Sequence, residues 1–170
     1  MVAPRTLTLE RLREVLAFDP DTGVFRWMVR LSNRVTIGDV AGCRVRMGGS
    51  VYVQIRIGGR LYMAHQLAWF YTNGEWVDLI DHRDLDGENN RLLNLREATP
   101  SQNQFNRARQ SNNSTGFKGV TFHGASKLYM ARITASGKCH LLGYFKTAEE
   151  AHGAYAAAAH RLHGEFARLA

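Results

Sequence analysis

The sequence predicts an α+β fold, and three observations predict it. Alternating apolar side chains mark strands before residue 64, a strand–loop–strand–helix order follows in the middle of the chain, and three strand patterns precede one helix near the C-terminus. Three strands packed on one helix make a complete small α+β unit. We therefore expect a strand-rich N-terminal lead-in at 1–63, a ββα core at 64–110, and a C-terminal three-stranded antiparallel sheet packed on one helix at 115–170.

The N-terminal lead-in contains one helix and several strand patterns. Three leucines at helical spacing predict a short amphipathic helix over residues 8–17. Turn residues then separate this helix from a strand at 24–29. Alternating apolar residues predict a strand at 50–57, and Gly58-Gly59 predicts a two-residue hairpin turn into a strand at 60–63.

The centre of the chain follows with a helix, two strands and a second helix. The segment 64–71 is apolar enough for a buried helix, and a short apolar strand at 77–82 comes next. A polar loop at 83–90 separates it from a second strand near 93–98. The run Thr99-Pro-Ser-Gln combines a helix cap, a proline at the first helical position and a capping box, so we expect a helix over 100–109.

The C-terminal part begins after a polar Asn/Ser-rich linker at 109–116. Strand patterns occur at 117–122, 128–134 and 139–145. A helix begins at Thr147, where Glu150 completes another capping box. Its apolar stripe recurs at helical spacing and is expected to pack on the sheet through Ala151, Tyr155, Ala158 and Leu162.

Charge is distributed unevenly along the 170 residues, whose net charge is +7. Residues 1–64 carry ten arginines against five acids (+5), residues 65–106 three against seven (−4), and residues 107–170 nine basic side chains against three acids (+6). Basic flanks suit a polyanion such as nucleic acid. An acidic centre would repel that polyanion unless a divalent metal ion binds there. Solvated faces of one mixed domain are the alternative explanation.

Other protein classes do not fit the composition. The longest charge-free stretch has 14 residues, whereas a membrane-spanning helix needs about 20 apolar residues, so no membrane segment is expected. The first residues carry charges before any apolar run, unlike a signal peptide. Cys43 and Cys139 form neither a zinc pattern nor a disulfide framework. We expect a cytoplasmic protein.

Four polar residues of the acidic centre form a candidate metal site: Asp81, His82, Asn94 and Asn103. Mg²⁺ takes oxygen ligands, which Asp81 and Asn103 can supply, and a histidine is suited to deprotonate water near neutral pH. Neighbouring strand residues point to opposite faces, so Asp81 and His82 share a site only where the strand ends or bends. An EF-hand loop does not fit the spacing, and zinc lacks clustered ligands.

The run at 64–106 resembles an HNH homing endonuclease of the phage and intron type. The motifs that carry the resemblance are H-x-L-A-W, I-D-H, the polar N-N turn, N-L-R and T-x-S-Q-N. The resemblance implies a ββα-metal core with one Mg²⁺ or Mn²⁺ ion, His82 as general base, and Asp81 and Asn103 as metal ligands. Asn94 is expected to brace the loop. His65 matches an upstream family histidine, for which packing and phosphate contact are equally open.

The run at 115–169 resembles the APETALA2/ERF DNA-binding domain. Its motifs are G-F-K-G-V, L-G-Y-F, T-A-E-E-A and the tail H-G-E-F-A-R-L. The resemblance implies a sheet that lies in the major groove of DNA. Cys139 and Leu141 depart from the plant pattern, so we expect DNA binding without the plant sequence preference. The DNA-facing positions of the family fall on Lys118, Thr121, His123, Arg132 and Thr134.

We therefore expect a metal-dependent, site-directed DNA endonuclease that hydrolyses phosphodiester bonds in double-stranded DNA. A monomer with one site most simply nicks one strand, and a double-strand cut, the target sequence and the choice between Mg²⁺ and Mn²⁺ stay open. The alternative is a non-catalytic DNA-binding regulator with a vestigial HNH site. The N-terminal arginines either contact the DNA backbone or lie on the wet side of a hairpin: Arg44, Arg46, Arg56 and Arg60.

Overall fold

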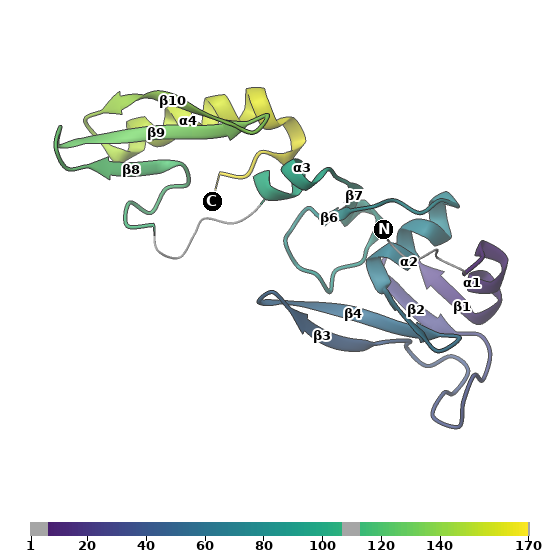
Figure 1. The fold of residues 1–170 in the computed structure, drawn as a ribbon. Coiled ribbons are helices and arrows are strands. Elements are labelled where there is room, and N and C mark those ends of the chain that lie inside the picture. The colour runs from purple at the N-terminus through teal and green to yellow at the C-terminus, as the bar shows by residue number, and fades with distance from the viewer. Residues whose placement is uncertain (1–6, 107–112, 170) are drawn as a thin grey trace. The chain divides into compact units, whose positions relative to one another are not determined.

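The computed structural model describes residues 7–106 and 113–169 as a mixed α/β protein with several small sheets. The chain divides into two compact units, Met1–Glu97 and Ala98–Ala170 (Figure 1). Each unit has its own apolar core. Among the described residues, none of the helices combines the length and the apolar character that crossing a lipid bilayer requires.

The first unit begins with helix α1 (Leu9–Val15), capped by the Thr8 hydroxyl, which accepts the Arg11 N–H. The prediction of a helix to residue 17 is wrong at its end. Leu16 has extended backbone angles and begins strand β1 (Leu16–Asp19), which pairs with β2 (Val24–Trp27). Leu16 is fully buried there, so an apolar residue at helical spacing belongs to a strand.

A three-stranded antiparallel sheet follows, in the order β3-β4-β5. Strands β4 (Ser50–Ile57) and β5 (Arg60–Met63) have the predicted bounds and the predicted two-glycine turn. Strand β3 (Cys43–Met47) was not predicted, because nearly all of its side chains are exposed and it shows no apolar face. Two of the N-terminal arginines, Arg44 and Arg46, extend from this exposed strand.

Helix α2 (Ala64–Asn73) confirms the predicted buried helix and supplies the centre of the first core. It ends where Gly74 takes a left-handed conformation with φ of 76°, which glycine adopts without steric cost. The core surrounds this helix with side chains from both neighbouring sheets, and its most deeply buried members include Leu12, Leu16, Phe25, Ile55 and Leu67.

A short hairpin closes the first unit. Strand β6 (Ile80–His82) pairs antiparallel with β7 (Leu95–Glu97), and the 3₁₀ turn η1 (Leu92–Asn94) precedes β7. Both strands are shorter than the predicted 77–82 and 93–98. The strand–loop–strand order predicted from the sequence is present, and the third element of that order, a helix, begins the second unit.

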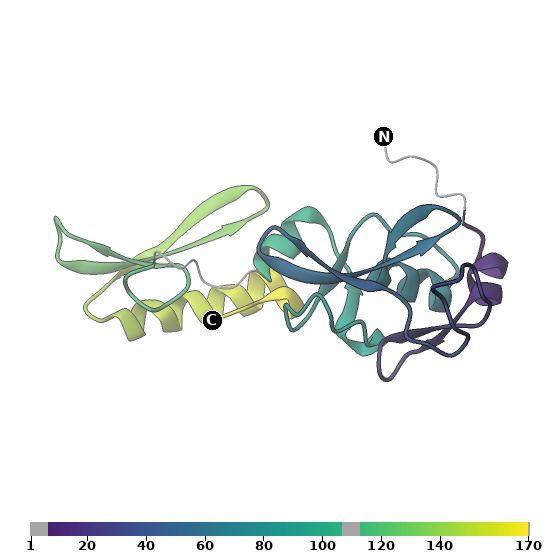
Figure 2. The ribbon, with the colours of Figure 1, turned by 90° about the horizontal axis from the view of Figure 1, so that it is seen from below.

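The second unit starts with helix α3 (Pro100–Phe105), whose predicted capping box between Thr99 and Gln102 is present. The remainder of the predicted helix, 107–109, and most of the predicted linker lie outside the described residues. A sheet in the order β10-β9-β8 follows and packs on helix α4 (Ala148–His163), as the two views show (Figures 1 and 2). The short turn η2 (Gly164–Phe166) ends the described elements.

The three strands of this sheet largely match the expectations: β8 (Val120–His123), β9 (Leu128–Ala135) and β10 (Lys138–Phe145). Strand β8 begins at Val120 rather than at residue 117. Gly119 precedes it with φ of 75°, outside the strand region, and lies against the Tyr155 ring so closely that a methyl group would not fit.

The predicted apolar stripe of α4 is correct at three of its four positions. Ala151, Tyr155 and Ala158 are buried against the sheet, where Ala131 and Ile133 of β9 are buried with them. The prediction that Leu162 packs on the sheet is wrong, because 42% of the surface of this residue is exposed. The neighbouring His163 is buried instead and hydrogen-bonds through Nε2 to the Thr134 carbonyl oxygen, at 2.9 Å.

Candidate functional site

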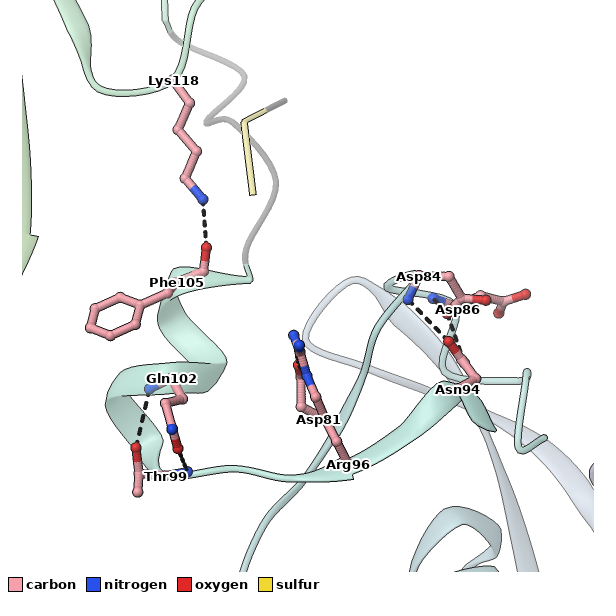
Figure 3. Close-up of polar contacts among 9 residues, drawn as sticks. All are labelled: Asp81, Asp84, Asp86, Asn94, Arg96, Thr99, Gln102, Phe105 and Lys118. Carbon is pink, nitrogen blue, oxygen red and sulfur yellow. Dashed lines mark hydrogen bonds and ion pairs between the residues drawn. The ribbon is translucent and has the colours of Figure 1, made fainter. Parts of the chain in front are cut away.

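The β6–β7 hairpin places Asp81 directly opposite Arg96. One carboxylate oxygen of Asp81, Oδ2, accepts hydrogen bonds from Arg96 Nε at 2.9 Å and from Nη2 at 2.7 Å (Figure 3). Both side chains are nearly fully buried, with 3% and 6% exposed. Asp81, the predicted metal ligand, therefore has an arginine partner that the sequence motifs alone did not predict. Antiparallel pairing of the two short strands is the signal that could have found it.

His82 is the last residue of β6, so the strand ends where a shared site with Asp81 requires it to end. Its ring is buried, and its Nε2 lies 3.3 Å from the amide oxygen Oδ1 of Asn90. Burial lowers the pKa of His82, although the Asn90 hydrogen bond and nearby carboxylates act in the opposite direction. The ring is thus held in the neutral form that can accept a proton.

Two further rings enclose His82. The His65 ring of α2 lies edge-on to it, with centroids 5.0 Å apart, and the Tyr52 ring of β4 lies 6.1 Å away. Burial, followed by the charge of His82, lowers the pKa of His65 to about 3. Within the part of the chain that the structure describes, the buried Nδ1 of His65 has no hydrogen-bond partner. A neutral, buried ring favours packing over phosphate contact for His65.

The loop between β6 and β7 is tied together by Asn94. Its Oδ1 accepts the Asp84 backbone N–H at 3.1 Å, and its Nδ2 donates to Asp84 Oδ1 at 2.9 Å (Figure 3). The same Nδ2 also donates to the Asn89 carbonyl oxygen at 2.7 Å. Burial would raise the pKa of Asp84, but hydrogen bonds from Asn89, Asp86 and Asn94 lower it. Asn94 thus joins the two ends of the loop, in keeping with the bracing role expected of it.

The same loop also lies tightly against the rest of the first unit. A methyl group on Gly87 would overlap the Val51 carbonyl oxygen and the Tyr52 ring of β4. On the other side, Gly23 leaves room for the backbone at Asn90. The Arg91 Nε donates to a carbonyl of the same β1–β2 turn at 2.9 Å. These contacts hold the loop between the sheet and the turn.

Asn103 lies in the first turn of α3 and is half-buried. Its helix belongs to the second compact unit, whereas Asp81 and His82 belong to the first. The hydroxyl of Thr99 accepts the Gln102 N–H, and the Gln102 side chain accepts the Thr99 N–H, so the start of this helix is fixed locally (Figure 3). Joint coordination of a metal ion by Asp81 and Asn103 stays a prediction.

The candidate site offers few side chains that could coordinate a metal ion. Among the described residues, no group of three or more His, Cys, Asp or Glu side chains gathers in a metal-binding arrangement. The donors predicted from the sequence, one carboxylate and one amide oxygen, nevertheless match in type what a hard divalent cation takes.

Four of the five predicted DNA-facing residues share one face of the second sheet. Thr121 pairs with Met130 across β8 and β9, and Arg132 and Thr134 alternate with the inward side chains of β9. His123 follows Thr121 by two residues and its Nδ1 contacts the Ser126 hydroxyl at 2.9 Å. Since α4 covers the opposite face, this one points away from the core of the unit (Figure 2).

Lys118 differs from the DNA-facing expectation. Its Nζ donates to the Phe105 carbonyl oxygen at 2.7 Å, at the end of α3 (Figure 3). Burial, followed by the charge of Arg168, lowers the pKa of Lys118 to about 8. The side chain is half-buried, and Gly119 follows it with a positive φ of 75°. Lys118 therefore binds a helix end in this structure.

Comparison with known proteins locates the family resemblance. Residues 62–105 match the family model described as HNH endonuclease. The chain is 39% identical over 92 residues to an uncharacterized HNH endonuclease of Acanthamoeba polyphaga mimivirus. The aligned region covers 54% of this chain and 45% of that protein. The chain is also 34% identical over 87 residues to Protein 3.8 of Escherichia phage T7. This aligned region covers 45% of this chain and 72% of that protein.

The chain thus spans less than half of the mimivirus protein and most of the phage protein. No solved structure matches it. The matched segment begins at the end of β5, runs through α2, β6 and β7, and ends with α3. It contains all five buried polar side chains of the first unit's described residues: His65, Asp81, His82, Asn90 and Arg96. Residues 62–105 therefore form an HNH endonuclease domain.

Proposed function

We propose that this protein is a metal-dependent DNA endonuclease in which His82 is the general base. The observation that carries the proposal is the buried, neutral ring of His82, hydrogen-bonded to Asn90 and next in sequence to Asp81, within the segment that matches the HNH family. General bases work best as neutral groups poised beside the water they deprotonate. His82 would take the proton of the attacking water, and hydrolysis would leave a 5′-phosphate and a 3′-hydroxyl.

A divalent cation, Mg²⁺ or Mn²⁺, would be held by Asp81 and Asn103 together with phosphate oxygens of the substrate. When bound, such a cation supplies positive charge at the scissile phosphate and at the departing oxygen. Arg96 would fix the orientation of the Asp81 carboxylate, since it holds one oxygen through two N–H groups. His65 and Tyr52 would exclude water from the far side of the His82 ring.

The second unit would hold the duplex. Its outward sheet face carries Thr121, His123, Arg132 and Thr134, and this face would lie in the major groove if the resemblance to the APETALA2/ERF domain holds for its DNA contacts. Arg132 is exposed and is the strongest cationic candidate on this face. Phosphate contacts would supply affinity, and base contacts would supply specificity for a target site, as a homing endonuclease requires.

The test is cleavage of a supercoiled plasmid by the full chain with Mg²⁺, with Mn²⁺ and with EDTA. We expect relaxed circles with either metal and none with EDTA. His82→Ala should lower the cleavage rate at least about 100-fold and leave DNA affinity within about twofold, since general base catalysis typically contributes that much. His160→Ala, an exposed histidine of α4, is the matched control. Full cleavage by His82→Ala would remove His82 from the mechanism.

One observation favours a second candidate, a DNA-binding regulator without nuclease activity. The buried Asp81–Arg96 ion pair neutralises the carboxylate that the metal would need. The same plasmid experiment separates the two functions, because a regulator binds DNA under every condition and relaxes no plasmid with either metal. Cleavage by wild-type protein that EDTA abolishes would exclude the regulator.

A further inference from the structure

The side chain of Asn90 makes two hydrogen bonds that together fix its orientation. It is 3% exposed and lies in the loop between β6 and β7. Its Nδ2 donates to the Glu88 carbonyl oxygen at 3.1 Å. A carbonyl oxygen only accepts, so the amide nitrogen must be the atom on that side. The amide oxygen therefore faces His82 Nε2, 3.3 Å away.

This orientation determines which nitrogen of His82 carries the proton. An amide oxygen cannot donate, so Nε2 must donate to it, and a neutral imidazole has only one ring proton. The nitrogen with the basic lone pair is then Nδ1. We propose that Asn90 is a positioning residue that fixes the tautomer of His82 and thereby selects Nδ1 as the atom that receives the proton of water. The inference rests on the proposed function for its chemical consequence.

The surroundings of Asn90 are rigid enough to impose this choice. The backbone at Asn90 and Arg91 lies directly on Gly23, with no space for a side chain between them. The Leu92 N–H donates to the Pro20 carbonyl at 3.0 Å, which ties the loop to the same turn. His65 packs edge-on against the His82 ring. A site held from both sides by packed elements keeps its geometry without the substrate.

The direct test is the tautomer of His82 in the full chain without DNA or metal. Protein with ¹⁵N-labelled histidine, at a pH of about 8, gives ring nitrogen shifts that distinguish protonated from unprotonated nitrogen; His82→Gln identifies the His82 signals. We expect His82 to be protonated on Nε2 alone. Asn90→Ala should give a mixture of the two tautomers, whereas Asn89→Ala, the neighbouring asparagine that contacts Asp84 rather than His82, should not.

Plasmid cleavage supplies the second readout. Asn90→Ala should lower kcat on the order of 10- to 100-fold with KM for DNA within about twofold, as loss of a partner that orients a reactive group does. Asn90→Asp keeps an acceptor for Nε2 and should restore kcat to within about tenfold of wild type, with the single tautomer retained.

Two results overturn the inference: a wild-type His82 protonated on Nδ1, or an Asn90→Ala variant that keeps the pure Nε2–H tautomer. The wild-type spectrum decides even where the variant does not fold. Failure of the wild-type protein to cleave DNA would refute the proposed function, and the spectra would still decide whether Asn90 fixes the tautomer.

Discussion

The two compact units bury polar side chains in very different ways. Among the described residues, the first unit buries two histidines, an aspartate, an arginine and an asparagine, all within the segment that matches the HNH family. The second unit buries Asn106 and His163. Burying polar groups costs free energy unless each is paired, so their concentration marks this segment as the candidate functional site. The second unit instead presents its polar residues on an open sheet face.

The packing of glycines separates loops from hairpin turns in both units. Gly23 and Gly87 lie directly against the loop or the sheet of the first unit, and Gly119 lies against the Tyr155 ring of the second, so that no methyl group would fit at these positions. The hairpin-turn glycines have no neighbouring atom within 4 Å of an added methyl group: Gly58 and Gly59 in the first unit, and Gly124 and Gly137 in the second. The loop between β6 and β7 is therefore held in place by its surroundings, whereas the hairpin turns of both units face open space.

The largest expected effect comes from breaking the buried ion pair of the first unit. Arg96→Met leaves the Asp81 carboxylate buried without its arginine. Removing one partner of a buried pair typically destabilises a protein by about 3–5 kcal/mol. We expect a loss of that size in the free energy of unfolding, measured by urea denaturation followed by circular dichroism.

Two variants show whether burial is the cause. Arg11→Met removes a partner from the exposed Arg11–Glu14 pair of the same unit and should cost less than about 1 kcal/mol. The double variant Asp81→Leu/Arg96→Met replaces both charges with apolar groups and should recover most of the lost stability. Equal losses of stability in Arg11→Met and Arg96→Met would contradict the claim that burial makes the Asp81–Arg96 pair costly to break.

A smaller effect is expected from Gly87→Ala, which tests the packing of the loop. The added methyl group would overlap the Val51 carbonyl and the Tyr52 ring, and overpacking costs about 1–3 kcal/mol. Gly124→Ala is the matched control, since neither glycine has a positive φ and Gly124 faces open space. We expect its melting temperature to stay close to that of wild type. Unchanged stability of Gly87→Ala would show that the loop is loosely held.

His65, one of the two buried histidines of the first unit, should make stability depend on pH. The pKa of His65 is about 3 in the folded protein, well below the ordinary 6.5, because burial disfavours the charged ring. The unfolded chain thus binds one more proton between these values, so stability falls as the pH drops below 6.5. From pH 7.5 to 5.0 His65 alone should account for a loss of about 2 kcal/mol, measured by urea denaturation at each pH as the difference between wild type and His65→Phe.

The matched variants for this effect are His65→Phe and His160→Ala. His65→Phe removes one of the two buried histidines and should make the pH profile shallower above pH 5, leaving the part due to the lowered pKa of His82. His160 is exposed on α4, and its removal should leave the profile as it is. A wild-type profile that is already flat between pH 7.5 and 5.0 would mean that His65 is protonated in the folded protein.

Local signals predicted most of the elements. Both capping boxes, the β4–β5 turn and the three strands before α4 follow from short patterns that reflect local chemistry. Strand β3 had no such signal. It is an edge strand, and because nearly all of its side chains are exposed, its sequence shows no alternation of apolar and polar residues. The early end of α1 depends on β1 pairing with β2, which no property of α1 itself indicates.

The candidate site was predicted as a set of residue types and not as a set of contacts. The motifs identified Asp81, His82 and Asn94, and the structure adds that the first pairs with Arg96, the second with Asn90, and the third with the loop backbone. These partners depend on strand register and loop conformation, which the spacing of a motif does not contain. Lys118 shows the same limit, since its contact with the α3 end depends on tertiary packing.

The smallest expected effect is on the second unit and concerns DNA affinity. Arg132 lies exposed on the outward sheet face, opposite the face that α4 covers. If it neutralises one phosphate, Arg132→Gln should weaken binding and reduce the slope of log affinity against log salt by about one. Fluorescence anisotropy of a labelled duplex with the full chain in EDTA measures this. Arg161→Gln removes an equal charge at an exposed position of α4 and should leave the slope of log affinity against log salt unchanged. Equal slopes for both variants would mean that the outward face of the sheet contributes no more to binding than any other basic surface of that unit.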